Sequence, residues 1–268
     1  MHHQFYSPSE GNLEGKILIA PVVSTANVGQ LAADLIISSL DLHRIGIFNP
    51  RDLVPVVGAR EDDRPGVSTP LELYGRQEAN IVVIQQRSPA LKSRKDEFIL
   101  NLYSFIQSSR FSAVVFLSGV DTSSRTDGQM SIPTYKLVPP GTPSWDDSSP
   151  LAIFTRAPIP TYASISQQPF SHMQEGGITE AVPFIPGGGL TRRILSSFPQ
   201  KWSTPILSLL QFVSEGDNRT DAQLLASVVS RLFDAPSTGN GVNKIEWKQP
   251  KSWNGGLFGT PHDQTLYG

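Results

Sequence analysis

The chain has 268 residues, of which 38% are hydrophobic and 17% charged, and its formal net charge is −2. This length allows one large α/β domain with a sizeable core. The balanced charge, without a long Lys/Arg block, argues against nucleic acid and anionic membranes as partners. The sequence shows no apolar run long enough for a membrane span and no signal peptide. We therefore expect a protein inside the cell, in the cytoplasm, with the nucleus as a second location to consider.

The N-terminal half alternates between predicted strands and helices. Residues 1–12 are polar and predict a disordered terminus, followed by a single α/β domain over 13–233. The apolar run Lys16–Val22 predicts a central strand, and Asn27 can cap a helix that follows it. Further strands are predicted at Arg44–Phe48, Val54–Val57, Asn80–Gln85 and Ala113–Ser118, with a second amphipathic helix between about Arg94 and Ser108. This alternation favours an α/β fold with a mainly parallel or mixed sheet flanked by helices.

The second half begins with a stretch that is poor in periodic patterns. Residues 120–183 predict an irregular insertion with one or two strands, of which Leu151–Thr155 is a candidate. A strand is then predicted at Ile206–Val213, followed by a helix starting near Thr220, which has capping-box spacing with Gln223. The last ~35 residues, 234–268, are rich in Gly and Pro and predict a flexible tail spanning roughly 30–35 Å.

Two motifs must be weighed as sites of chemistry. The glycines Gly187–Gly189, after Pro186, could cradle an anion, but they lack the residues of a phosphate-binding loop, so a structural turn is favoured. Glu215 and Asp217 follow a predicted strand, where active sites of α/β folds gather. Because Asp217 or Asn218 can also accept hydrogen bonds from the first amides of the next helix, capping is favoured over catalysis.

Other catalytic and metal-binding chemistry has little support in the sequence. The chain has no cysteine, which excludes disulfides, thiol nucleophiles and thiolate metal sites. Its histidines are scattered over termini, a helix end and loops, as His2, His3, His43, His172 and His262. A nucleophile elbow of the G-x-S-x-G type does not occur. We therefore predict no catalytic residue, no metal and no cofactor, and a protein that works by binding other proteins.

The C-terminal residues Leu266, Tyr267 and Gly268 form a candidate docking peptide. Such a peptide can bury two side chains while a cation on the partner captures the α-carboxylate. Burial of Leu266 and Tyr267 would contribute roughly 1.5–3 kcal/mol each before ordering costs. The peptide alone should bind weakly, so specific attachment would also need contacts from the folded body.

Four stretches of the chain together resemble the PAC2 family of proteasome assembly chaperones. They are VVSTANVGQLAADLIIS (22–38), LVPVVG (53–58), FIPGGGLTRRIL (184–195) and LLQFVSEGDNRTDAQLLA (209–226). The resemblance implies a nucleoside phosphorylase-like α/β fold without a known active site. It also implies a heterodimer with proteasome assembly chaperone 1 that binds 20S core-particle α subunits, promotes α-ring assembly and prevents off-pathway association. The end Leu266-Tyr267-Gly268 resembles the hydrophobic-Tyr-any (HbYX) peptide, which docks in a pocket of the α ring.

Two further hypotheses remain open at this stage. One places Phe212–Asn218 and the helix Val28–Ser39 near the interface with the partner chaperone. The other is a nucleoside phosphorylase-like enzyme that uses the Pro186–Gly189 loop for phosphate and Glu215 or Asp217 for proton transfer. Only analogy at the level of the fold supports the enzyme.

Overall fold

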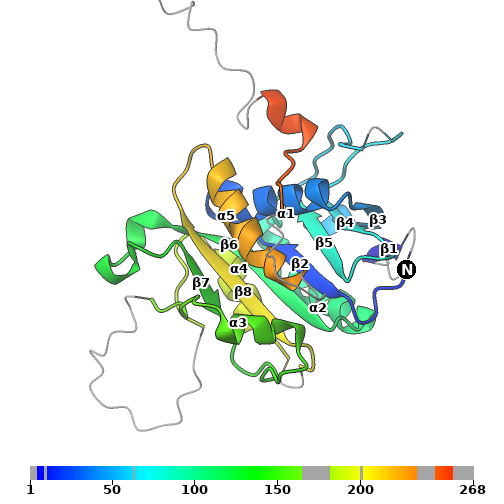
Figure 1. The fold of residues 1–268 in the computed structure, drawn as a ribbon. Coiled ribbons are helices and arrows are strands. Elements are labelled where there is room, and N and C mark those ends of the chain that lie inside the picture. The colour runs from blue at the N-terminus through cyan, green and yellow to red at the C-terminus, as the bar shows by residue number, and fades with distance from the viewer. Residues whose placement is uncertain are drawn as a thin grey trace, which may run out of the picture.

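A computed structural model describes residues 5–8, 11–62, 64–164, 182–199, 202–233 and 245–255. These residues form one eight-stranded sheet in the order β1-β3-β4-β5-β2-β6-β8-β7, with helices on both faces (Figure 1). The strands are β1 (Tyr6–Pro8), β2 (Ile17–Pro21), β3 (His43–Phe48), β4 (Leu71–Gly75), β5 (Ile81–Gln86), β6 (Ala113–Asp121), β7 (Thr134–Leu137) and β8 (Ile206–Val213).

The sheet is mixed, as the sequence predicts. Strands β5, β2, β6 and β8 run parallel at its centre, and the neighbours beyond them pair antiparallel. All residues of β2, β5 and β8 are buried, which explains their nearly continuous apolar sequences. The α/β class predicted from the sequence is therefore confirmed.

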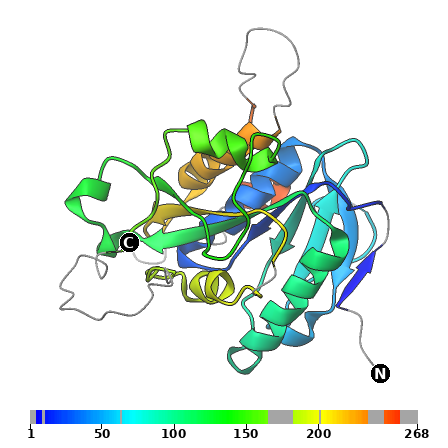
Figure 2. The same ribbon diagram turned by 90° about the horizontal axis from the view of Figure 1, so that it is seen from below.

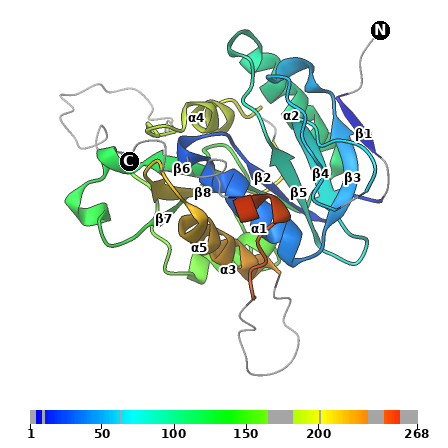
Figure 3. The ribbon, with the colours of Figure 1, turned by 90° about the horizontal axis from the view of Figure 1, so that it is seen from above.

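The helices divide between the two faces of this sheet (Figures 2 and 3). They are α1 (Val28–Ser39), α2 (Lys95–Ser109), α3 (Ile153–Arg156), α4 (Gly189–Ser196) and α5 (Arg219–Val229). Short 3-10 turns are η1 (Thr25–Asn27), η2 (Pro50–Asp52), η3 (Lys92–Arg94), η4 (Thr122–Ser124), η5 (Asp127–Gln129), η6 (Pro150–Ala152), η8 (Ser230–Leu232) and η9 (Lys251–Gly255). One core cluster lies under α1, α3 and α5, and the other lies under α2 and α4. In the part of the chain that the structure describes, no helix combines the length and apolar character needed to cross a membrane.

Two predicted strands are wrong. Residues 54–57 do not form a strand; the residues on either side of them, Leu53 and Gly58, each make an isolated bridge, to Ala90 and Ser68. Pro55 explains this, because proline has no N–H to donate to a ladder. The segment Leu151–Thr155 is helical instead, forming η6 and α3. Pro150 is well suited to the first position of a helical turn, and Ser149 Oγ accepts a hydrogen bond from the N–H of Leu151.

The predicted helix caps are only partly right. Asn27 lies in the left-handed region, with φ 52°, and its side chain makes no capping bond. Helix α5 begins at Arg219, one residue before the predicted start, so the Thr220–Gln223 capping box is wrong. Asp217 Oδ1 accepts a hydrogen bond from the N–H of Arg219 at 3.2 Å, which confirms the predicted bond from Asp217, whereas Asn218 at the N-cap position makes no side-chain capping bond.

Both ends of the chain contribute more structure than predicted. The sequence predicts order from about residue 13, but β1 pairs with β3, so the prediction of disorder is wrong for Tyr6–Pro8. Within the predicted tail, residues 245–255 pack on the body, with Trp253 only 4% exposed. The predicted insertion 120–183 contributes β7 and α3 within its described residues, 120–164 and 182–183. Leu266, Tyr267 and Gly268 lie outside the described residues.

Candidate functional site

The carboxyl ends of the parallel strands are the usual place for a site in this class of fold. After β2 the chain passes through α1 to β3, which lies on one side of β2 in the strand order. Strands β6 and β8 lie on the other side of β2. The strand order therefore reverses between β2 and β6, and a crevice is expected there. Loops that follow β2, β6 and β8 converge on this edge, together with the turn before α4.

The chain's own backbone fills this crevice. Ser24 Oγ accepts a hydrogen bond from the N–H of Gly119 at 2.8 Å, which holds η1 against β6. A Cβ atom added to Gly119 would lie 2.3 Å from the carbonyl oxygen of Thr25. A Cβ added to Gly187 would lie 1.8 Å from the Thr25 hydroxyl oxygen. The space between β2 and β6 is therefore closed by the backbone and the hydroxyl of Thr25, at distances from Gly119 and Gly187 that leave no room for a Cβ.

The glycine loop has the structural role that the sequence favours. Gly187 has φ +71°, a value that suits glycine, and the N–H of Gly188 donates to the carbonyl oxygen of Ile185 at 3.0 Å. Helix α4 begins at the next residue, Gly189. These contacts form a tight turn that leads into the helix and packs against η1.

Glu215 and Asp217 have separate partners. Glu215 Oε1 accepts a hydrogen bond from the N–H of Ala26 at 3.1 Å, and so ties the loop after β8 to η1. Ala26 needs such support because its φ of 57° is unfavourable for a residue with a Cβ. Asp217 pairs with Arg219, and hydrogen bonds from that side chain and its backbone lower the pKa of Asp217. Both carboxylates thus organise this edge of the molecule.

The described residues include no cluster of three or more His, Cys, Asp or Glu side chains that could hold a metal ion. Of the five histidines, only His43 is described, and it lies on β3. His2, His3, His172 and His262 lie outside the described residues.

The feature that sequence reasoning missed is residues 245–255, called here the C-terminal strap. Trp247 Nε1 donates to Ser227 Oγ at 2.9 Å, near the end of α5. The N–H of Lys248 donates to Ser39 Oγ at 2.8 Å, at the end of α1. The strap then runs back along both helices, and Trp253 packs in the core cluster that α1 and α5 share.

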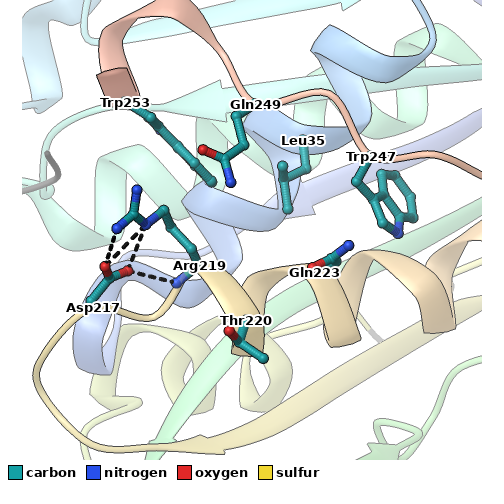
Figure 4. A pocket seen from close by; sticks show the side chains of 8 residues that line it. All are labelled: Leu35, Asp217, Arg219, Thr220, Gln223, Trp247, Gln249 and Trp253. Atoms are coloured by element: carbon teal, nitrogen blue, oxygen red, sulfur yellow. Dashed lines mark hydrogen bonds and ion pairs between the residues drawn. The ribbon is translucent and has the colours of Figure 1, made fainter. Parts of the chain in front are cut away.

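The strap and the two helices line a half-open pocket of about 380 Å³, called here the strap cavity (Figure 4). Its lining is Leu35 from α1, Asp217, Arg219, Thr220 and Gln223 from the start of α5, and Trp247, Gln249 and Trp253 from the strap. The two indoles lie on the strap side, and the Arg219 guanidinium is engaged by Asp217 (Figure 4). Amide and hydroxyl groups on this lining can bind polar groups.

The strap brings Ser252 to the carboxyl edge of the sheet. The N–H of Ser252 donates to Glu61 Oε2 at 3.2 Å, and Glu61 belongs to the long connection between β3 and β4. Gly255 is the last described residue, thirteen residues before Gly268, so the end of the chain reaches at most ~45 Å from it. A signal for the strap was present in the sequence, because two of the four tryptophans, Trp247 and Trp253, lie in this Gly- and Pro-rich segment.

Comparisons with known proteins agree with this architecture. The model of the PAC2 family matches residues 18–238. Proteasome assembly chaperone 2 of Bos taurus is 32% identical over 264 residues, which cover 96% of each chain. Proteasome assembly chaperone 2 of Homo sapiens is 32% identical over 271 residues, covering 97% of each.

Solved structures show the same fold at low sequence identity. Pyrococcus furiosus PbaA, an archaeal homolog of proteasome-assembly chaperone, has a TM-score of 0.56 at 15% identity, with 87% of this chain and 88% of that chain covered. Pyrococcus furiosus PbaB, an archaeal proteasome activator, has a TM-score of 0.52 at 13% identity, with 86% and 90% covered. The family match spans most of the chain, and the relatives match almost end to end, so this chain belongs to the PAC2 family.

Proposed function

We propose that this chain is a proteasome assembly chaperone that acts by binding other proteins. The names of its relatives support this role, and the C-terminal strap is the structural observation that carries it. A segment anchored by a buried tryptophan holds Ser252 beside one edge of the body, and a terminal peptide tethered from there could engage one partner together with the body.

The proposed partners are proteasome assembly chaperone 1, in a heterodimer, and the α subunits of the 20S core particle. In this role the heterodimer promotes α-ring assembly and prevents off-pathway association. The loop at the end of β8, Phe212–Asn218, is the candidate contact with the partner chaperone, because several of its residues are exposed at the carboxyl edge. We leave α1 out of this contact, since the strap covers it from Leu35 to Ser39.

Glu215 offers a clean test of this loop. Glu215→Gln keeps an oxygen that can accept the bond from Ala26 N–H but removes the negative charge, whereas Glu215→Lys reverses the charge and loses the acceptor. If the charge contacts the partner, co-purification with proteasome assembly chaperone 1 weakens in both variants. An intact heterodimer in both, with normal folding, would remove Glu215 from the interface.

The terminal residues Leu266, Tyr267 and Gly268 are proposed to enter a pocket of the α ring, where a lysine would pair with the Gly268 carboxylate. The strap supports this proposal by shortening the tether. Ten residues, 256–265, separate the strap from the peptide, whereas 32 residues, 234–265, of the predicted tail precede the peptide. A shorter tether raises the effective concentration of the peptide at a pocket within its reach.

The test is to delete residues 266–268 from the full chain, co-expressed with proteasome assembly chaperone 1, and to measure binding to 20S core particles by surface plasmon resonance. We expect at least a tenfold loss of affinity, and a similar loss for Tyr267→Ala. Thr265→Ala, one residue before the peptide, is the matched control and should bind normally. Undiminished affinity after the deletion would rule out this docking.

A further inference from the structure

An apolar hollow lies beside the strap, on the connection between β3 and β4. It has a volume of about 380 Å³ and is lined by Ile47, Phe48, Pro50, Pro55, Val56, Val57, Thr69 and Pro70. The lining includes no charged residue. Val57 is 79% exposed, and Val56 and Ile47 are each more than a third exposed. Contiguous exposed apolar surface of this kind marks a place where another segment or molecule binds.

Backbone hydrogen bonds hold the hollow in shape. The N–H of Val54 donates to the carbonyl oxygen of Pro89 at 3.0 Å, and Ser88 Oγ donates to the carbonyl oxygen of Val54 at 2.6 Å. Gly58 and Ser68 exchange two backbone hydrogen bonds, which close the connection behind Val56 and Val57. A surface fixed in this way needs little rearrangement to receive a ligand, which lowers the cost of binding.

Lys251 and Ser252 of the strap lie close to this hollow. Val56 and Val57 also line a neighbouring depression, whose other residues include Glu61, Lys251 and Ser252. The hydrogen bond from Ser252 N–H to Glu61 Oε2 joins the strap to the same connection. The strap thus fixes the point from which the following residues leave the body.

The sequence after Gly255 matches the hollow in chemistry and in length. It reads Gly256-Leu257-Phe258-Gly259, two large apolar residues between glycines. Two or three residues extend at most ~7–11 Å, a distance that suits a neighbouring site. Because Leu257 and Phe258 are tethered there, their effective concentration at the hollow is in the millimolar range, which a free partner would have to exceed.

We propose that Leu257 and Phe258 of the same chain pack into the apolar hollow. The strap then continues across the β3–β4 connection, and only residues 260–268 extend from the body. Their reach is at most ~30 Å, which narrows the region in which Leu266-Tyr267-Gly268 could bind. The inference concerns contacts within the chain, so it can be tested without any proteasome partner.

The absence of natural cysteines allows a direct test. Val57→Cys and Gly259→Cys, introduced together in the full chain, place one thiol at the hollow and one just after Phe258. The equilibrium between this disulfide and glutathione gives the effective concentration of the pair. Adding Leu257→Ser and Phe258→Ser should lower that effective concentration at least tenfold, because the tether remains while the apolar contact is lost.

Leu266→Ser with Tyr267→Ser is the matched control, since it removes two apolar residues downstream of the cysteine. This control should leave the effective concentration unchanged. The proposal would be overturned if the effective concentration of the cysteine pair were the same with and without Leu257 and Phe258. Disulfides formed mainly between two copies of the chain would also overturn it, because they would show that a second molecule covers the hollow. Thr69→Cys in place of Val57→Cys repeats the test from another wall of the hollow.

Discussion

Two openings in this molecule are closed in different ways. The crevice between β2 and β6 is filled by the backbone of η1, which packs directly on Gly119. The groove between α1 and α5 is covered by side chains of the strap, above all Trp247 and Trp253, and a cavity remains beneath them. The first closure joins loops at the carboxyl ends of the central strands, whereas the second lies outside the helices, so we expect it to open without unfolding the sheet.

This difference bears on function. In doubly wound α/β proteins, small molecules bind at the crevice where the strand order reverses. Here that crevice is packed, and the adjustable surfaces are the strap and the exposed loops around it. Such a distribution suits a protein that binds other proteins through its surface and its chain end. Mutations that affect either the packed crevice or the strap, but not both, therefore test whether the two regions differ in this way.

The largest effect is expected at Gly119. Gly119→Ala would place a Cβ 2.3 Å from the Thr25 carbonyl oxygen, so η1 would have to move away from β6. We expect a loss of about 3 kcal/mol in the free energy of unfolding, the cost of overpacking a site that backbone already fills. Urea denaturation followed by circular dichroism measures it. Gly128→Ala is the control, because a Cβ there meets no atom within 4 Å, and it should change stability by less than about 0.5 kcal/mol.

The next effect is expected at the strap. Trp253→Ala removes the side chain that anchors the segment and should cost about 2 kcal/mol, less than a core tryptophan, because the segment can detach without unfolding the sheet. Hydrogen exchange at the amides of Lys248 and Ser252 should rise sharply while the central strands keep their protection. Gln249→Ala, at an exposed position on the same cavity, should change neither the free energy of unfolding nor the hydrogen exchange of the strap. If hydrogen exchange rose equally in the strap and in the central strands, the strap would not open independently of the sheet.

The two closures also differ in how well the sequence predicts them. The central strands and α1, α2 and α5 follow from apolar runs and helical periodicity, because those patterns reflect burial in the sheet and on its faces. The packing of Thr25 on Gly119 depends on residues about ninety positions apart, and the sequence pattern does not encode that contact. The strap was missed because its Gly and Pro content resembles a linker. Its anchors are isolated tryptophans that show no periodicity.

In the candidate site, too, the sequence predicts local contacts but not contacts between residues far apart in the chain. The capping role of Asp217 follows from its position before a helix, which is local information. The bond from Ala26 N–H to Glu215 is a long-range contact and could not be predicted from spacing. Strand β4 was missed for a related reason, and the strand predicted within residues 120–183 proved to be β7 rather than Leu151–Thr155. Strands β4 and β7 both pair at the outer parts of the sheet, where short strands with mixed sequences depend on their neighbours for stability.

A smaller effect is expected at Glu215, which joins the two loops that close the crevice. Glu215→Ala removes the acceptor for Ala26 N–H and should cost about 0.5–1 kcal/mol. Ala26→Gly should recover much of this loss, because glycine accepts the positive φ of residue 26 without strain. Thermal unfolding of the two single variants and the double variant measures both changes. If Ala26→Gly destabilises the wild-type chain, the strain assigned to Ala26 is wrong.

The smallest effect is expected at Asp34, on the turn of α1 that also carries Leu35 of the strap cavity. Burial is the main cause that raises the pKa of Asp34, while Arg87 and a hydrogen bond from Gln85 oppose the rise. Because the folded pKa lies above the unfolded value, the proton on Asp34 stabilises the fold at low pH. That contribution is lost as pH rises through the folded pKa.

Asp34→Asn cannot titrate, and its side-chain oxygen can still accept the bond from Gln85. The unfolding free energy of this variant minus that of the wild type should therefore increase as pH rises from below the unfolded pKa to above the folded one. The pairing with Arg87 acts on the ionised carboxylate and is already part of the folded pKa, so it makes this increase smaller without reversing it. A difference that falls with pH would mean that Arg87 outweighs burial at this site. The α1 side of the groove would then be held by an ion pair rather than by packing beneath the strap.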